Sequence, residues 1–321
     1  MIFYVVSFLV SIIVLAWLGT HLIETLTRLA KYLGWREFVV AFFVMAVAGS
    51  LPNLFVDISA ALRGFPQLAF GDIVGGNLVD LTLVMGLAIL MSKKSIPAES
   101  KMIQYSAFFT AIISLMPLLL VLDGRLGRID GVILIITFFL YAFWLFSKED
   151  RFKKVYTGKK QSPLKGFKGF FKDIIKIIVF LVVLLLASQV IINSSEYFSL
   201  KLGIPLSLVG LLIVGLGNCF PEAYFSIVSA RKGEGWMILG DLMGSVISCA
   251  SLVLGIVAII SPFEIYDFSP FIIARIFLIV TLGLFIIFVR TGKKLTKSEG
   301  LILISVYIVF LLVEIFRQFT F

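Results

Sequence analysis

The residues of this sequence that could do chemistry are polar side chains set inside long apolar stretches. Glu222 follows Pro221 directly, and Ser226 lies one helical turn beyond it. Asn53 also follows a proline, and Asp57 lies one turn further on. Carboxylates, amides and hydroxyls are hard oxygen ligands, which suit calcium, sodium or protons better than soft metals. These positions therefore predict a site for hard cations.

Further oxygen donors follow in the next apolar stretches. Asn77 and Asp80 are three residues apart and therefore share a helical face, and Ser245 lies in a matching later stretch. The single histidine and the two cysteines do not form the clusters at helical spacing that soft metals require. Because no nucleophile–base set or nucleotide-binding loop is present, the sequence does not predict an enzyme.

The elements that carry these residues must be long apolar helices. Hydrophobic residues make up 60% of the 321 positions, and the mean hydropathy is +1.10. About 20 helical residues cross the hydrocarbon core of a bilayer, whereas barrel strands alternate every second residue. The sequence predicts an all-α integral membrane protein with ten transmembrane helices, over residues 2–30, 37–62, 68–91, 103–122, 130–147, 173–198, 204–230, 236–260, 269–289 and 299–317.

One long polar segment, residues 148–172, separates two sets of five spans. It holds nine basic and two acidic residues, so the positive-inside rule predicts a cytoplasmic linker. We expect an N-terminal repeat over 1–147, the linker over 148–172 and a C-terminal repeat over 173–321. Both termini would then be extracytoplasmic in a cell membrane. The net charge of +9 follows from this topology and does not indicate nucleic acid as a partner.

The two halves are related in sequence. With a shift of 169 residues, segment 46–86 aligns with 215–255 without a gap, and ten of 41 positions are identical. Six of these ten are Gly, Pro or Asp, a register that hydrophobic composition alone does not produce. Halves with an odd number of spans must be inverted relative to each other. Pro52 and Pro221 interrupt helices at matched positions, a pattern typical of secondary transporters with midplane ion sites.

The two aligned segments resemble the alpha repeats of the calcium/cation antiporter superfamily, which includes sodium/calcium and calcium/proton exchangers. In that family each repeat carries a G-[ST]-S-x-P-E type motif followed by G-[ND]-x-x-G-S-N. This chain has GSLPN and GDIVGGN in one repeat, and GNCFPE and GDLMGS in the other. The resemblance implies that Glu222 is the motif glutamate, that Asn53 takes the glutamate position of the first repeat, and that Asn77 matches the motif asparagine.

These residues give our candidate site. The expected metal ligands are Glu222, Asn53 and Asn77. Further expected ion-binding residues are Ser50, Asp57, Asp80, Ser226 and Ser245, and the backbone positions at the helix breaks are Gly49, Pro52, Asn218 and Pro221.

The site departs from the family pattern because one central carboxylate is replaced by Asn53. A divalent ion in a low dielectric needs about two compensating charges. One hypothesis is that Asp57 or Asp80 supplies the second charge. The other is that the protein moves monovalent cations or protons through Glu222.

We expect a secondary active antiporter that exchanges calcium for sodium by alternating access, with the first and sixth spans sliding across the core. The alternatives are a calcium/proton or monovalent cation/proton antiporter and, in a different class, a channel or transport-inactive scaffold. We expect no cofactor beyond the transported calcium, sodium or protons, and a lipid bilayer as surroundings. The driving ion, stoichiometry, affinity and oligomeric state are left open.

Overall fold

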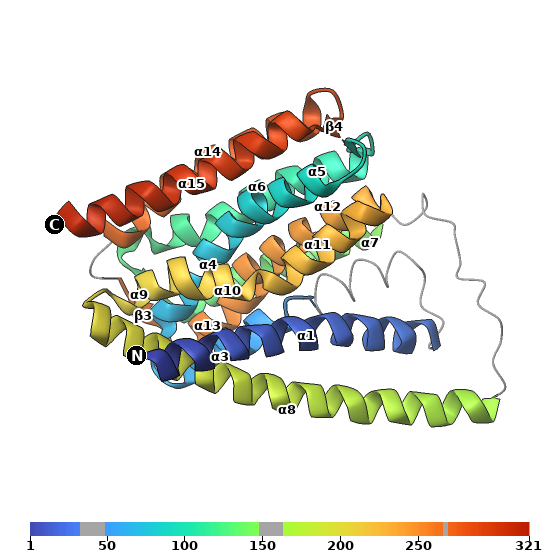
Figure 1. Cartoon of the computed structure of the whole chain (residues 1–321), viewed down its shortest axis with the longest axis horizontal. Coiled ribbons are helices and arrows are strands. Elements are labelled where there is room, and N and C mark those ends of the chain that lie inside the picture. The colour runs from blue at the N-terminus through green and yellow to red at the C-terminus, as the bar shows by residue number, and fades with distance from the viewer. Residues whose placement is uncertain (33–48, 148–162, 266–268, 321) are drawn as a thin grey trace.

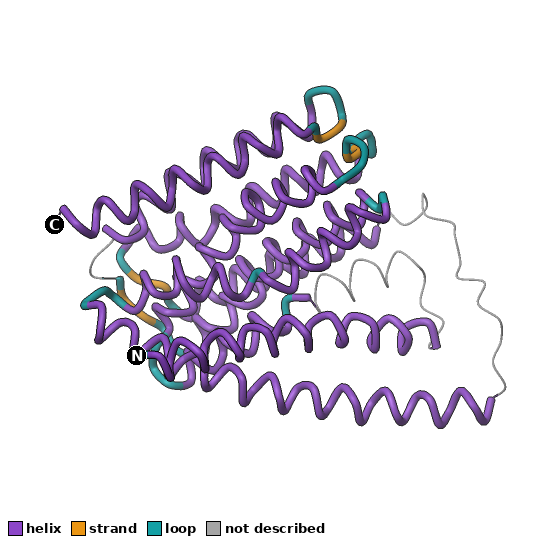
Figure 2. Tube along the Cα trace, in the orientation of Figure 1, coloured by secondary structure: helices purple, strands orange, loops and turns teal. Residues whose placement is uncertain are grey.

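The computed structural model describes residues 1–32, 49–147, 163–265 and 269–320, which form a bundle of long helices (Figures 1 and 2). In this part of the chain, nine helical segments are long and apolar enough to cross a membrane. The second predicted span begins outside the described residues, and its described part is the apolar helix α3 (Leu51–Leu62). The all-α membrane architecture predicted from the sequence is confirmed.

The helices of the first half follow the predicted order. Continuous apolar runs form them because only helices satisfy every backbone hydrogen bond within the segment in lipid. Their bounds are α1 (Ile2–Tyr32), α3 (Leu51–Leu62), α4 (Pro66–Val79), the π-helical segment η2 (Asp80–Val84), α5 (Met85–Met91), α6 (Lys101–Leu120), the 3-10 turn η3 (Val121–Asp123) and α7 (Arg128–Ser147), with short strands β1 (Ile96–Pro97) and β2 (Arg125–Leu126).

The second half repeats this order. Its bounds are α8 (Pro163–Leu202), α9 (Leu206–Val209), the π-helical segment η5 (Gly210–Val214), α10 (Gly215–Asn218), α11 (Phe220–Lys232), α12 (Gly235–Ile247), the π-helical segment η6 (Ser248–Val253), α13 (Leu254–Ile260), α14 (Ser269–Arg290) and α15 (Lys297–Thr320), with strands β3 (Phe263–Glu264) and β4 (Lys294–Leu295).

Helix α8 begins at Pro163, within the segment 148–172 that is expected to be the linker. Proline has a fixed φ that suits the first turn of a helix, so the basic residues that follow it continue into the helix. Residues 148–162 lie outside the described ranges.

Helix interruptions occur at matched places in the two halves. The helix before Pro221 ends at Asn218, and α11 begins after Cys219. Ser50, the repeat equivalent of Cys219, has the same near-zero ψ before α3 begins. The π-helical segments η2 and η6 also correspond under the shift of 169 residues. Such bulges are frequent at functional sites, where they redirect side chains.

Two small ribbons show that the halves are inverted. Strand β1 pairs antiparallel with β4, and β2 pairs antiparallel with β3. The shift of 169 residues relates β2 to β4 and places β1 next to β3, so it exchanges the two ribbons. The ribbons lie at opposite ends of the bundle (Figure 1). Both chain termini lie at one end, and α8 begins at the other. The inverted-repeat prediction is confirmed.

The core of the bundle is formed by the spans that contain α4 and α12, the most buried of the nine. Glycines allow α4 to approach the neighbouring span closely. A Cβ on Gly71 would overlap the carbonyl oxygen of Ser207, and one on Gly75 would overlap that of Leu211. Small residues at helix contacts are a general means of packing in membranes.

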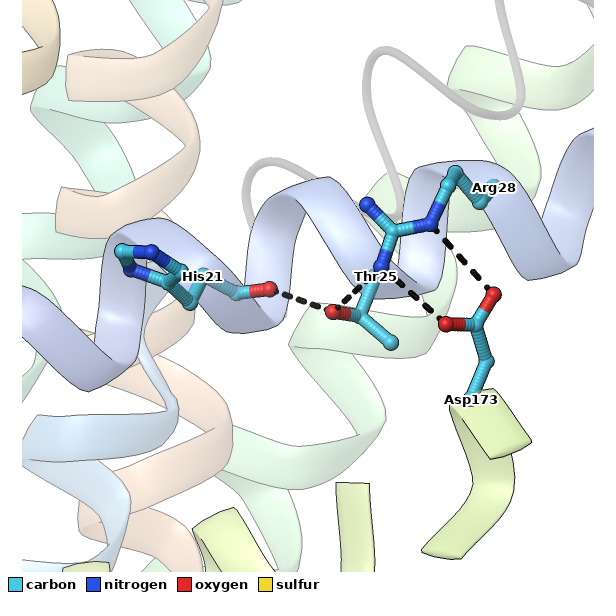
Figure 3. A network of polar contacts seen from close by, with 4 residues as sticks. All are labelled: His21, Thr25, Arg28 and Asp173. Carbon is cyan, nitrogen blue, oxygen red and sulfur yellow. Dashed lines mark hydrogen bonds and ion pairs between the residues drawn. The ribbon is translucent and has the colours of Figure 1, made fainter. Parts of the chain in front are cut away.

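Helices α1 and α8 lie side by side along one edge of the bundle (Figure 1). Near the end of α1, Arg28 donates from Nη2 to Thr25 Oγ1 over 3.1 Å and to Asp173 Oδ1 over 3.1 Å (Figure 3). Tyr4 and Tyr197 stack toward the other end, with ring centroids 4.0 Å apart. The two helices are therefore joined at both ends.

Candidate functional site

The first polar cluster forms around Glu222, which is 2% exposed. Pro221 places it in the first turn of α11, where the helix dipole favours a negative charge. Ser245 of α12 donates from Oγ to Glu222 Oε1 over 3.2 Å. Asp80, at the start of η2, lies near Ser245 and Cys219 and close enough to Glu222 to interact with it electrostatically. Two carboxyl groups from opposite repeats are therefore neighbours in this cluster.

A second, neutral cluster is the repeat counterpart of the first. The shift of 169 residues exchanges Glu222 with Asn53 and Asp80 with Cys249. In the structure, Asn53 Nδ2 donates to Cys249 Sγ over 3.5 Å. The pseudo-symmetry therefore places an amide and a thiol where the first cluster has two carboxyls.

A third cluster joins α3, α4 and α10. Asn218 Nδ2 donates to Asp72 Oδ2 over 2.5 Å. The carboxyl groups of Asp57 and Asp72 lie within hydrogen-bonding reach of each other. Asp57 is fully buried, and no donor in the described residues reaches either of its oxygens. The Asp57–Asp72 contact can therefore be a hydrogen bond only when one of the two carboxyls carries a proton.

The charge of the interior is unbalanced. Six carboxyl groups are no more than 3% exposed. Glu314 pairs with Arg317, whereas the ion pairs of the described residues include none of the other five: Asp57, Asp72, Asp80, Glu222 and Asp241. Each charged residue at the centre of a membrane helix costs about 2.5–3.5 kcal/mol. Five uncompensated carboxylates would cost on the order of 10 kcal/mol or more, as much as a typical protein's whole stability. The interior therefore requires bound cations or protons.

The remaining predicted residues are also buried, but the structure does not gather all of them around Glu222. Asn77 is 3% exposed and lies one helical turn before Asp80. Ser226 is fully buried on α11, one turn after Glu222. Ser50 and Gly49 are buried immediately before α3. The predicted site therefore occupies several adjoining clusters.

The protein ligands of a divalent ion would have to be mixed. Within the described ranges, no three His, Cys, Asp or Glu side chains are grouped closely enough to hold a metal ion. Amide, hydroxyl and carbonyl oxygens would have to complete the shell. The expected set, in which Asn and Ser accompany the carboxylates, stays a prediction.

The predicted site set did not include Cys249, Asp72 or Asp241. The repeat shift pairs Cys249 with Asp80, and this pairing could have identified the thiol as a site residue. Asp72 and Asp241 also pair under the shift and are both buried. No local signal joins Asp72 to Asn218, because 146 residues separate them.

The fold and the clusters define an all-helical membrane protein of inverted repeats with an acidic interior. The sodium/calcium exchanger protein family matches residues 3–147 and 172–316, which is most of both halves. The chain belongs to this family.

Individual relatives match along nearly their whole length. Sodium/calcium exchanger MaX1 of Methanosarcina acetivorans is 24% identical, over 96% of this chain and 98% of the relative. Inner membrane protein YrbG of Escherichia coli is 23% identical, over 94% of each chain. The solved sodium–calcium exchanger NCX_Mj, soaked with Na⁺ and Sr²⁺, has the same fold with a TM-score of 0.67. It is 22% identical, and the match covers 96% of this chain and 97% of NCX_Mj.

Proposed function

We propose that this protein is a secondary active antiporter that exchanges calcium for sodium by alternating access. The observation that carries the proposal is the proximity of two buried carboxyls, Glu222 and Asp80, which lie beside Ser245 without a basic ion-pair partner in the described residues. Two carboxylates supply the two charges that a divalent ion needs. Of the two acidic residues considered for the missing charge, Asp80 lies beside Glu222, whereas Asp57 faces Asp72.

The choice of ions has support from relatives. MaX1 is named a sodium/calcium exchanger, and NCX_Mj has been studied with Na⁺ together with Sr²⁺ or Ca²⁺. The hard oxygen donors around Glu222 suit these same ions.

The moving part in this proposal is the pair α1 and α8. A Cβ on Gly19 of α1 would lie 3.2 Å from Pro52 Cγ and 3.4 Å from Pro221 Cβ, so α1 crosses both helix breaks. Arg28 and Asp173 join α1 to α8 (Figure 3). Sliding of this pair over the two prolines would open the clusters to one side of the membrane and then to the other.

The test is ⁴⁵Ca²⁺ uptake into proteoliposomes driven by an outward sodium gradient. We expect uptake by the wild type and a loss of at least about tenfold in Glu222→Gln and Asp80→Asn, because each substitution removes one of the two negative charges that balance a divalent ion in a low dielectric. The control is Asp123→Asn, an exposed carboxylate paired with Arg125 at the end of α6.

The outcomes separate the alternatives. Uptake driven by a proton gradient and not by sodium would replace this proposal with the calcium/proton antiporter. Passive leak without exchange would indicate a channel. Full exchange in Glu222→Gln would show that the site is elsewhere.

A further inference from the structure

A cavity between α1 and α8 has no role in the proposed exchange. Its volume is about 480 Å³, and pockets of about 300–1,000 Å³ commonly hold small molecules. The first turns of α1 form one wall, and the last turns of α8 form the other. This is the end of the bundle where both chain termini lie (Figure 1). Because both helices span the membrane, the cavity lies at the level of the lipid headgroups.

The lining of the cavity is polar and aromatic. Glu196 and Asn193 come from α8, and Ser7 comes from α1. Tyr4 and Tyr197 stack against each other with nearly parallel rings, so each covers one face of the other. The two rings therefore do not form the open aromatic cage that a quaternary ammonium group prefers. A carboxylate beside an amide and a hydroxyl suits a ligand that has N–H donors.

A positive charge lies beside the carboxylate. Arg63, which follows α3, donates from Nη1 to Asn193 Oδ1 over 2.5 Å, and its Nη2 lies 3.5 Å from Glu196 Oε2. The side chains of Arg63 and Glu196 are 31% and 43% exposed, and ion pairs at such positions contribute little to stability. Each group can therefore bind a further charge, one negative and one positive.

Exposed apolar side chains lead away from the cavity along both helices. On each helix they recur every three or four residues and therefore form a stripe on one face. The stripes consist of Val6, Val10 and Ile13 on α1 and of Val182, Leu186 and Val190 on α8. Val190 also lines the cavity, so the apolar surface begins where the polar lining ends. The whole surface therefore fits a ligand with a charged head and long apolar chains.

We propose that this cavity binds one molecule of phosphatidylethanolamine, with its headgroup in the cavity and its acyl chains along the two stripes. The primary ammonium group donates to Glu196. The phosphate accepts from Arg63 and from the hydroxyl of Ser7.

The charges of the site distinguish this headgroup from others. Phosphatidylglycerol has a phosphate but no cation, so it would bring a second negative charge to Glu196. Phosphatidylcholine has a cation without N–H groups, so it cannot donate a hydrogen bond to the carboxylate. Phosphatidylethanolamine has one phosphate and one cation that donates, which complements Arg63 and Glu196.

A lipid in this cavity contacts both α1 and α8. It joins them at the end opposite the ion pair of Arg28 and Asp173. If the two helices slide as one body, removal of the lipid should slow exchange. This consequence rests on the proposed function, whereas binding of the lipid does not.

The test is native mass spectrometry of the purified full-length protein in detergent, with an equimolar mixture of dioleoyl phosphatidylethanolamine, phosphatidylcholine and phosphatidylglycerol. We expect the wild type to retain one phosphatidylethanolamine with a preference of at least about fivefold over the other two lipids. Glu196→Gln keeps the size of the side chain but removes its charge, so it should lose the preference over phosphatidylcholine. Ser7→Phe fills the cavity and should retain less of all three lipids.

The matched control is Glu264→Gln. Glu264 is an exposed carboxylate on β3, at the same end of the bundle but not among the residues that line the cavity (Figure 1). This variant should keep the wild-type preference.

Three results would overturn the assignment. The first is equal retention of the three lipids by the wild type, and the second is a preference for phosphatidylethanolamine that survives both Glu196→Gln and Ser7→Phe. The third is displacement of the lipid by an equal concentration of O-phosphoethanolamine, since this would show that the acyl chains contribute nothing. Retention as expected in a protein that performs no exchange would support the lipid site and contradict only the proposed function.

Discussion

The side-chain amide of Asn53 donates a hydrogen bond to the thiol of Cys249 over 3.5 Å. The repeat shift relates this pair to Glu222 and Asp80, so the pseudo-symmetric structure has one neutral and one acidic half-site. A symmetric exchanger ancestor with carboxyls in both halves would carry twice the charge at its centre. The present asymmetry restricts the proposed divalent ion to one side of the pseudo-twofold axis.

The neutral half-site should become a cation site when its charges are restored. We expect the double variant Asn53→Glu and Cys249→Asp to unfold at a lower temperature than the wild type without cations, because two new buried carboxyls repel each other. Calcium should then raise its Tm more than it raises that of the wild type. Differential scanning fluorimetry with and without calcium measures both effects. An equal calcium response in the two proteins would contradict a half-site at this position.

The two cysteines should report the access state of the site. Cys219 is 1% and Cys249 3% exposed, so neither thiol is open in this conformation. We expect slow modification by a small positively charged thiosulfonate reagent, and a rate at least about fivefold lower when calcium is bound. Mass spectrometry of Cys219→Ser and Cys249→Ser assigns each modification. Rapid modification that calcium does not change would argue against an occluded site.

The glycines of α4 should be essential for packing. A methyl at Gly75 would overlap the backbone of Leu211, which cannot move away as a flexible side chain can. We expect Gly75→Ala to destabilise the protein by at least about 1–3 kcal/mol, the usual cost of overpacking. Gly283→Ala is the control, since a Cβ there meets nothing within 4 Å in the described structure. Its Tm should stay equal or rise slightly, because alanine favours helix.

In the proposed mechanism α1 slides over the helix breaks at Pro52 and Pro221, and we expect this sliding to limit the rate of transport. A leucine at Gly19 would press against Pro52 and Pro221, because its Cβ alone would lie 3.2 Å from Pro52 Cγ and 3.4 Å from Pro221 Cβ. We expect Gly19→Leu to bind calcium but to exchange it at least about tenfold more slowly. Ile13→Leu, at an exposed position of the same helix, should exchange at the wild-type rate. Equal initial rates for all three proteins in proteoliposomes would exclude sliding of α1 as the transport step.

Several features of this protein are determined by sequence alone. The spans follow from the length of apolar runs, which is a local property and fixes helices in a solvent without hydrogen-bonding partners. The inversion follows from the repeat and the odd number of spans in each half. Glu222 is identified by its position after Pro221, and the repeat shift already aligns it with Asn53. The linker over 148–172 stays a prediction, because a basic segment after Pro163 is compatible with either a loop or the first turns of α8.

Only the tertiary structure decided which polar residues meet. Helical spacing places Asp57 one turn from Asn53 and Asp80 one turn from Asn77, so it could not distinguish the two aspartates as partners of Glu222. The packing of α4 against α9, η5 and α10 brings Asp72 to Asn218, 146 residues away. The contact between Asn53 and Cys249 spans 196 residues. The contact of Asp72 with Asn218 depends on the close approach of α4 to the neighbouring span at Gly71 and Gly75, which is a property of two packed surfaces and not of either segment by itself.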